Sequence, residues 1–430
     1  MPTIAAQIQT FINAVATQAL GEGAIAAVNT EDYVSLGEQV LSNAESTSAF
    51  YSALSAEIGR TYALYRSLPE NRLGIQRTPL EFGAILRTLE IETIARFKDN
   101  SSWDNTNPIT ETILQDSTNA FCTYDSRRGT FEIDTKVIYD FQLRTAFHDA
   151  ESMAAFVEMI FRDMYNGMEL AIRQLENTTI CTGIALAYAS SLTSQCAVNL
   201  LVNYNTEFGE TLTPTTCMKD EKFLRYAASE IKKYKKYMED PSALFNPALC
   251  ERWTPSSDCQ VQVLEEFAAN CATYMQSSTF HDEMVKLPTY RERSFWQGIG
   301  TGSTADRSKI RIARGASGSE TYTAVDGVLA YVFDTESMAI MVDFIRTKSD
   351  YKPRYEHTEY YHKADWASLV RPTQQMIVFY VDEYYPVTVP AGDITDWSNK
   401  YTSYYTKNNQ TGAYSAATST YDSTAVYYKK

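Results

Sequence analysis

The first apolar residues of the chain recur at steps of three or four, the spacing that places side chains on one face of a helix. They are Ile4, Ile8, Phe11, Ile12 and Val15. Gly21 and Gly23 then interrupt the pattern. Because this segment has no core of its own to cover that face, we predict a helical arm over residues 1–75 that docks on a neighbouring chain.

Apolar and polar residues alternate in two later segments, as they do in half-buried strands. Leu89 and Ile91 alternate with glutamates, and Phe131 and Ile133 alternate with polar residues. A polar stretch at residues 99–108 lies between the two segments. We predict an extended β-arm over residues 76–140 with the four apolar side chains on one face, which also needs a neighbouring chain to cover it.

The longest predicted element follows the β-arm. Apolar residues recur at helical steps from about Glu151 to Leu175, which predicts a helix about 40 Å long. Beyond it, the sequence predicts two shorter helices and three strands: Asp220–Glu239, Val261–Met275, Val325–Phe333, Glu356–Leu369 and Met376–Val381. This mixture predicts an α+β fold, and a single core stops growing at roughly 250–300 residues, so we expect at least two subdomains.

The last forty residues differ in composition from the rest of the 430-residue chain. Residues 391–430 are rich in Tyr, Ser, Thr and Asn and contain few aliphatic side chains. Such a composition predicts a tail rather than a packed core. The whole chain has 30 tyrosines, an excess that suits surfaces half buried against other chains, because tyrosine combines a large contact area with a polar tip.

Charge and cysteine usage exclude several classes of protein. The chain carries a net charge of −15, and no apolar run approaches the roughly 18 residues that a membrane helix needs. The first basic residue is Arg60, so we expect neither a signal peptide nor a transit peptide. Seven cysteines stand at irregular spacing without a CxxC motif, which favours reduced, buried thiols over disulfides or a metal site.

Motifs for catalysis are missing from the sequence. The chain has four histidines, and His357 and His362 stand five apart in a predicted strand, hence on opposite faces. The glycines at residues 298–302 do not open a helix, so a mobile loop is favoured over a phosphate site. The lysines of segment 231–237 fit the polar face of an ordinary helix better than a nucleic-acid surface. We expect no catalytic, cofactor or metal site.

Three segments, taken in order, resemble parts of the major capsid protein of tailed bacteriophages, with the closest likeness to small short-tailed phages. Arg128-Gly129-Thr130-Phe131, followed by residues 143–147 and the long helix, resembles the strand that leaves the extended loop of that fold. Residues 325–333 resemble a strand leading out of the A-domain, and residues 371–379 resemble the closing strand of the P-domain. Polar Gln374 and Gln375 depart from the small apolar residues usual there.

The resemblance implies an organisation and a function. It implies an extended loop at residues 76–140, a P-domain at 141–210 and 346–390 and an A-domain at 211–345, while the 391–430 tail lies outside the family pattern. Copies would assemble into pentamers and hexamers of an icosahedral head that encloses double-stranded DNA, with a separate scaffolding protein and a portal, in the cytoplasm of the host bacterium. The predicted contacts between subunits are Ile4, Ile8, Phe11, Val15, Leu89, Ile91, Phe131 and Ile133.

Two other hypotheses about the function stay open at this point. One is another virion component, such as a minor capsid or fibre protein. The other is an enzyme with a tyrosine-lined cleft, which would need convergent carboxylates in a pocket.

Overall fold

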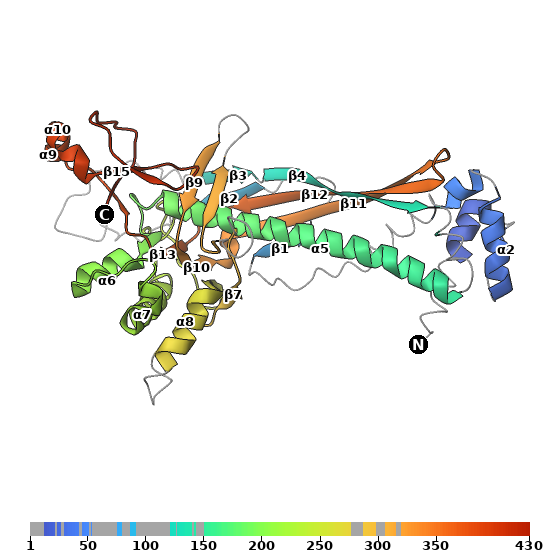
Figure 1. Cartoon of the computed structure of the whole chain (residues 1–430), viewed down its shortest axis with the longest axis horizontal. Coiled ribbons are helices and arrows are strands. Elements are labelled where there is room, and N and C mark those ends of the chain that lie inside the picture. The colour runs from blue at the N-terminus through green and yellow to red at the C-terminus, as the bar shows by residue number, and fades with distance from the viewer. Residues whose placement is uncertain are drawn as a thin grey trace, which may run out of the picture.

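One long helix organises the described part of the chain (Figure 1). The structure is a computed structural model, and it describes residues 13–21, 24–26, 30–42, 45–50, 53, 75–79, 87–91, 121–125, 127–139, 142, 150–276, 287–297, 306–314 and 320–430. Helix α5 (Ala150–Ala189) has 40 residues, so it is about 60 Å long. It lies along two sheets that form the body of the molecule (Figure 1).

The predicted long helix is confirmed, but it continues to Ala189 rather than ending at Leu175. The added turns contain threonines, which often compete with helical hydrogen bonds. Here the hydroxyls of Thr178, Thr179 and Thr182 donate to the carbonyl oxygens four residues earlier, each at 2.8 Å. The side chains are therefore satisfied inside the helix, and its apolar face can continue to pack.

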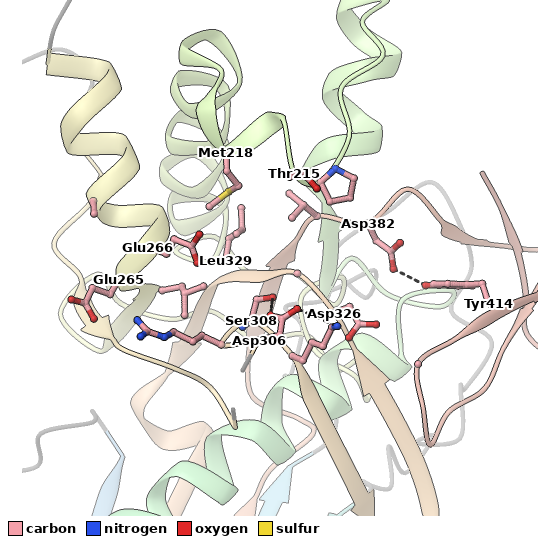
Figure 2. A pocket seen from close by; sticks show the side chains of 18 of the residues that line it. Thr215, Met218, Glu265, Glu266, Asp306, Ser308, Asp326, Leu329, Asp382 and Tyr414 are labelled. Carbon is pink, nitrogen blue, oxygen red and sulfur yellow. Dashed lines mark hydrogen bonds and ion pairs between the residues drawn. The ribbon is translucent and has the colours of Figure 1, made fainter. Parts of the chain in front are cut away.

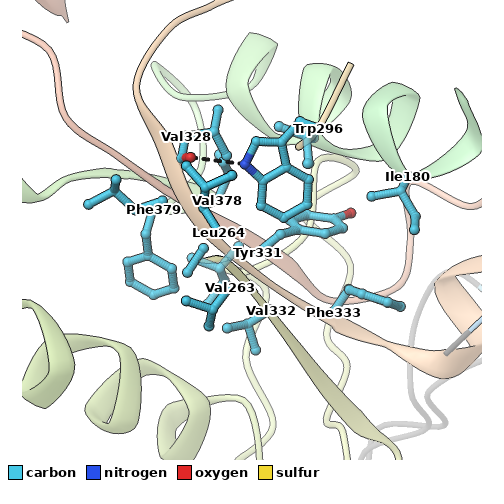
Figure 3. Close-up of a cluster of buried hydrophobic side chains, with 14 of the residues drawn as sticks. Ile180, Val263, Leu264, Trp296, Val328, Tyr331, Val332, Phe333, Val378 and Phe379 are labelled. Atoms are coloured by element: carbon cyan, nitrogen blue, oxygen red, sulfur yellow. Dashed lines mark hydrogen bonds between the residues drawn. The ribbon is translucent and has the colours of Figure 1, made fainter. Parts of the chain in front are cut away.

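A five-stranded sheet forms the core, with the strand order β5-β13-β10-β6-β7. The strands are β5 (Ala197–Asn199), β13 (Met376–Tyr380), β10 (Val328–Asp334), β6 (Cys259–Leu264) and β7 (Arg291–Arg293). Every residue of β10 and β13 is buried, as expected for strands covered on both faces. Figure 3 shows this cluster, in which the indole Nε1 of Trp296 donates to the carbonyl of Val328 at 2.9 Å.

A second sheet carries the long strands of the molecule, in the order β1-β11-β12-β4. It consists of β1 (Gln76–Pro79), β11 (Met338–Lys352), β12 (His357–Val370) and β4 (Arg127–Tyr139). Strands β11 and β12 pair at fourteen positions and extend beside α5 well beyond the core (Figure 1). The predicted strands Glu356–Leu369 and Met376–Val381 are confirmed within one residue at each end.

Two predictions in the core need correction. The helix predicted over Val261–Met275 begins as strand β6, and helix α8 (Glu265–Gln276) starts only after Leu264. A short apolar run with β-branched residues fits a buried strand as well as a helix, and here β6 pairs with β10. The strand predicted over Val325–Phe333 is two strands, because Gly327 has a φ of +66° and interrupts the ladder.

The remaining helices and strands surround these sheets. Helix α7 has Asp220 as its cap, with a side chain that accepts from the backbone of Phe223 at 2.8 Å. The predicted helix Asp220–Glu239 is thereby confirmed. The other elements are α2 (Thr30–Val40), β2 (Arg87–Ile91), β3 (Phe121–Asp125), α6 (Leu200–Phe208), η3 (Cys217–Lys219), α7 (Glu221–Tyr237), β8 (Ile310–Arg314), β9 (Thr321–Val325) and η5 (Thr335–Ser337).

The residues predicted to be a tail instead form a folded unit, which we call the C-terminal unit (residues 385–430). Its sheet has the order β14-β17-β15-β16, built from β14 (Tyr385–Val387), β17 (Tyr427–Lys429), β15 (Tyr405–Lys407) and β16 (Tyr414–Ala416). The short helices α9 (Ala391–Thr395), α10 (Trp397–Lys400) and η6 (Tyr401–Ser403) complete it. Trp397, Tyr404 and Tyr427 are buried together, so aromatic rings replace the aliphatic core that the composition lacks.

A buried lysine joins the C-terminal unit to the body. The Lys407 side chain is 1% exposed and its Nζ lies 4.9 Å from the ring centres of Tyr188 and Tyr414, a cation–π arrangement. The same Nζ lies 3.9 Å from Oδ2 of Asp382, which also accepts from the Tyr414 hydroxyl at 2.6 Å. Burial lowers the pKa of Lys407 and raises the pKa of Asp382, because both charges have lost water.

A second contact comes from the body side. Arg311 on β8 pairs with Asp326 at 2.7 Å and donates from Nη2 to the carbonyl of Thr411 at 3.0 Å. Gly412 follows with a φ of +78°, and a Cβ there would collide with the Arg311 guanidinium. The C-terminal unit is therefore attached by buried and half-buried charges from both sides of the junction.

A close contact between α5 and the core generates a first prediction. A Cβ at Gly183 would lie 2.6 Å from the hydroxyl oxygen of Tyr331 and 3.0 Å from Sδ of Met338. We expect Gly183→Ala to destabilise the protein by about 1–3 kcal/mol through overpacking, although alanine favours a helix over glycine. The free energy of unfolding in urea measures this, and Tyr331→Phe in the same chain should recover part of the loss because it removes the obstructing hydroxyl.

The Lys407 junction generates a second prediction. We expect Lys407→Met to cost about 3 kcal/mol, because it leaves the Asp382 carboxylate buried without its cation. Adding Asp382→Asn should restore much of this stability, and Lys400→Met on the exposed surface of the same unit serves as the matched control. Thermal unfolding of the three variants measures the effect. Equal stability of Lys407→Met and Lys400→Met would contradict a structural role for the buried pair.

Candidate assembly surfaces

The predicted contact residues of the helical arm are only partly described. Ile4, Ile8 and Phe11 lie outside the described residues. Val15 is described, and its side chain is 0% exposed within its own chain. This packing gives Val15 a core role in the single chain, and its contact with another subunit stays a prediction.

The four predicted contact residues of the β-arm belong to two different sheets. Leu89 and Ile91 lie on β2, where they face Thr123 and Phe121 of β3. Phe131 and Ile133 lie on β4, which pairs with β12 instead. The expectation of one face shared by all four is therefore corrected. Strand β3, which precedes β4 in the chain, is the partner of β2. The alternation pattern alone does not reveal this pairing.

A cleft with described walls lies between the body and the C-terminal unit (Figure 2). It has a volume of about 940 Å³ and is lined by residues from α8, β10, the end of β13 and the C-terminal unit. Three of its carboxylates have partners: Asp326 binds Arg311, Asp382 accepts from Tyr414, and Asp306 accepts from the hydroxyl of Ser308 at 2.7 Å. Glu265 and Glu266 at the start of α8 also line the cleft. No histidine is among its lining residues, so the Ser308 hydroxyl has no general base of that kind.

The described part of the chain also bears on metal binding and on membrane crossing. No group of three or more His, Cys, Asp or Glu side chains there is placed to hold a metal ion. His357 and His362 both lie on β12, as predicted, five residues apart. Among the described helices, none combines the length and apolar character that a bilayer crossing requires.

The described cysteines are packing residues. Cys181, Cys196, Cys217, Cys250, Cys259 and Cys271 are free and buried, in agreement with the sequence prediction. Burial raises the pKa of Cys181, Cys217, Cys259 and Cys271 to about 12. These thiols stay protonated at neutral pH, so they are poor nucleophiles.

The basic segment of α7 is confirmed as the polar face of an amphipathic helix. Phe223, Ala227, Ile231 and Met238 are buried along one stripe, while Lys232 and Lys233 are exposed. Lys233 pairs with Glu230 at 2.5 Å, and Lys236 pairs with Glu239. Part of the positive charge is therefore neutralised within the chain.

The structure reveals exposed apolar side chains that the sequence patterns missed. Leu170 on α5 and Phe295 after β7 are 57% and 50% exposed and line a cavity of about 580 Å³. A second group, at the end of α7 and in the loop that follows, consists of Tyr237, Leu244, Leu249 and Trp253. Single apolar residues in a proline-rich loop have no periodicity, so no sequence signal marks them as a surface.

Comparison with known proteins identifies the family. A model of the Phi29-like phage major capsid protein matches residues 12–380. No curated protein sequence matches the chain.

Solved structures that resemble the chain are distant in sequence. The capsid of Staphylococcus phage Andhra shares 10% identity with a TM-score of 0.46, over 73% of this chain and 84% of that chain. The capsid of Cyanophage P-SCSP1u shares 8% identity with a TM-score of 0.39, over 72% and 86% of the two chains. The mature capsid of bacteriophage PhiM1 shares 8% identity with a TM-score of 0.37, over 73% and 86%.

The family model spans most of the chain and ends at Tyr380, so the C-terminal unit lies beyond it. The mixed helix and strand content agrees with the predicted α+β fold. The chain belongs to the Phi29-like phage major capsid protein family and is a structural protein of the virion capsid.

Proposed function

We propose that copies of this chain assemble into pentamers and hexamers of an icosahedral head that encloses double-stranded DNA. The observation that carries this proposal is the family match over residues 12–380. The family is one of structural capsid proteins, and we extend this to the absence of any enzymatic activity. Assembly in the host cytoplasm with a separate scaffolding protein and a portal is part of the same proposal.

The shape of the described body supports a role in a lattice. Helix α5 and the paired strands β11 and β12 run side by side and form one elongated layer (Figure 1). A strand of 15 residues spans about 50 Å, far more than the five residues of β13 in the core. An elongated subunit has two long sides that can contact neighbouring subunits. Subunits that tile a shell need such contacts.

The edges of the long sheet favour contact through the arms. Strand β4 is one edge of the four-stranded sheet, and β2 with β3 forms a separate two-stranded ribbon. Edge strands offer unpaired backbone groups, and an isolated two-stranded ribbon is marginally stable in water. We propose that the extended loop at residues 76–140 reaches its full stability only against an adjacent subunit.

The remaining domain assignments are part of the proposal. We assign residues 141–210 and 346–390 to the P-domain and residues 211–345 to the A-domain, near the axes of the pentamers and hexamers. The parallel pairing of β13 with β5 supports joining residues 141–210 and 346–390 in one domain. Packaged DNA would lie near the inner wall without specific contacts.

A third prediction concerns the arm. We expect Ile91→Asp combined with Ile133→Asp to leave the subunit folded but to block shell formation. The lost burial would be intermolecular and worth roughly 2–3 kcal/mol for each side chain. Circular dichroism reports the fold, and sedimentation of the chain expressed with its scaffolding protein reports the shells.

A matched control places two aspartates on the same strands, at positions that lie on the opposite face of each strand. Thr88→Asp with Thr130→Asp changes β2 and β4 without touching the predicted apolar face. Shells should form from this control. Loss of the fold in the isoleucine variant would place both residues in an internal core instead.

A further inference from the structure

The junction of the C-terminal unit brings an amine and a carboxyl group together away from water. The side chains of Lys407 and Asp382 are 1% and 10% exposed, and Nζ of the lysine lies 3.9 Å from Oδ2 of the aspartate. Lysine is rarely buried so completely, because its charge is costly to remove from water. The pair links two parts of the fold, since Asp382 follows β13 of the body and Lys407 lies on β15 of the C-terminal unit.

The site favours the uncharged forms of both groups. Burial lowers the pKa of Lys407 and raises the pKa of Asp382. Asp326 and Arg311 are the other charged side chains that act on Lys407, and they pair with each other at 2.7 Å, so their charges largely offset each other. A proton can therefore pass from Nζ to the carboxyl group, which leaves an amine with a free electron pair beside a carboxylic acid.

Hydrogen-bond donors are aimed at both oxygens of Asp382. The backbone N–H of Tyr384 donates to Oδ1 at 3.0 Å, and the hydroxyl of Tyr414 donates to Oδ2 at 2.6 Å. The first donor would stabilise negative charge on Oδ1 when a nucleophile attacks the carboxyl carbon, and the second would assist the departure of Oδ2. The carboxyl group of Asp382 is therefore prepared as an electrophile.

The amine of Lys407 is confined beside that carboxyl group. Its Nζ donates to the hydroxyl of Tyr188 at 3.2 Å and lies 4.9 Å from the ring centres of Tyr188 and Tyr414. Reacting atoms in near-attack geometries are roughly 3–3.5 Å apart. A small rotation of the lysine side chain would bring Nζ this close to Cγ of Asp382, so the two groups are positioned to react.

We propose that Lys407 and Asp382 condense into an amide bond within the chain, which attaches the C-terminal unit covalently to the body. The bond between Nζ and Cγ forms, and the bond between Cγ and Oδ2 breaks. Two protons of the ammonium group leave with Oδ2 as water, and the third stays on the amide nitrogen, so no oxidant or co-reactant is needed. The water can leave through the cleft of Figure 2, which Asp382 and Tyr414 both line.

The bond would act within one subunit and does not depend on assembly. It closes a loop from residue 382 to residue 407 and so reduces the conformational freedom of the unfolded chain. The unit that it attaches lies beyond the family model, which ends at Tyr380. Lys407→Met lacks the bond with or without Asp382→Asn, so the comparison of these two variants still isolates the charge left in the junction.

Peptide mass spectrometry of the purified full chain tests the bond. Trypsin cuts an unmodified chain on both sides of residues 364–400 and again after Lys407, whereas the proline after Arg371 protects that site. We expect a single product that joins residues 364–400 to residues 401–429 and weighs one water less than the two together. Complete recovery of residues 364–400 and 401–407 as separate peptides would overturn the proposal.

Two controls show whether the buried site is responsible. Lys407→Arg keeps a positive charge at the junction but cannot form this amide, so its digest should contain only the separate peptides. Lys430 and Glu383 form an exposed ion pair in which Nζ lies 2.6 Å from Oε2, closer than in the buried pair. We expect no bond there, because solvent keeps both groups charged. A bond at Lys430 in the same yield would contradict a special role for burial.

A kinetic comparison tests the role of the Tyr414 hydroxyl. We expect Tyr414→Phe to slow formation of the joined product by about 100-fold, because removal of one such donor costs a rate factor of this order. Digests of samples taken at intervals after synthesis measure the rate, and circular dichroism reports the fold. Tyr405→Phe on the neighbouring strand β15 is the matched control and should react at the unaltered rate. Equal rates in both variants would overturn the role of Tyr414.

Discussion

The contact between Gly183 of α5 and Tyr331 of β10 limits how closely α5 can lie against the core sheet. A side chain larger than hydrogen would push the helix away from the sheet, because the Tyr331 ring is fully buried and has no space to move into. Because α5 packs against the core sheet, it covers one face of that sheet. The same helix continues along β11 and β12. The elongated layer on which the capsid role depends is therefore built outward from one close helix–sheet contact.

Long elements with a regular pattern were predictable from sequence. Helix α5 and strands β12 and β13 were located correctly because their apolar residues follow one period over many positions. The sequence pattern predicts a helix at strand β6 because six residues carry too little periodicity to decide, and the pairing of β6 with β10 is a tertiary effect. Composition predicts a tail in place of the C-terminal unit because the core of that unit is built mainly from tyrosine and tryptophan, which a composition rule counts as polar or loop-forming.

The candidate surfaces were less predictable than the fold. Alternation placed Leu89 and Phe131 in strands, but only the ladder shows that they belong to different sheets. The exposed apolar residues in the loop after α7, such as Leu244 and Trp253, follow no period. The loop is bound by a residue distant in sequence, because Gln375 donates to the carbonyl of Arg252. Polar residues that look misplaced in a strand motif can therefore hold a loop elsewhere in the chain.

The order of strands in the C-terminal unit has a consequence for how the protein is made. Strand β17 (Tyr427–Lys429) follows the described strands of the body in sequence, yet it lies inside the small sheet, between β14 and β15. During synthesis the strands of the body therefore emerge from the ribosome before Tyr427–Lys429 do. The small sheet can close only after these residues have emerged, so each newly made subunit forms its body strands before it can complete the junction with the C-terminal unit.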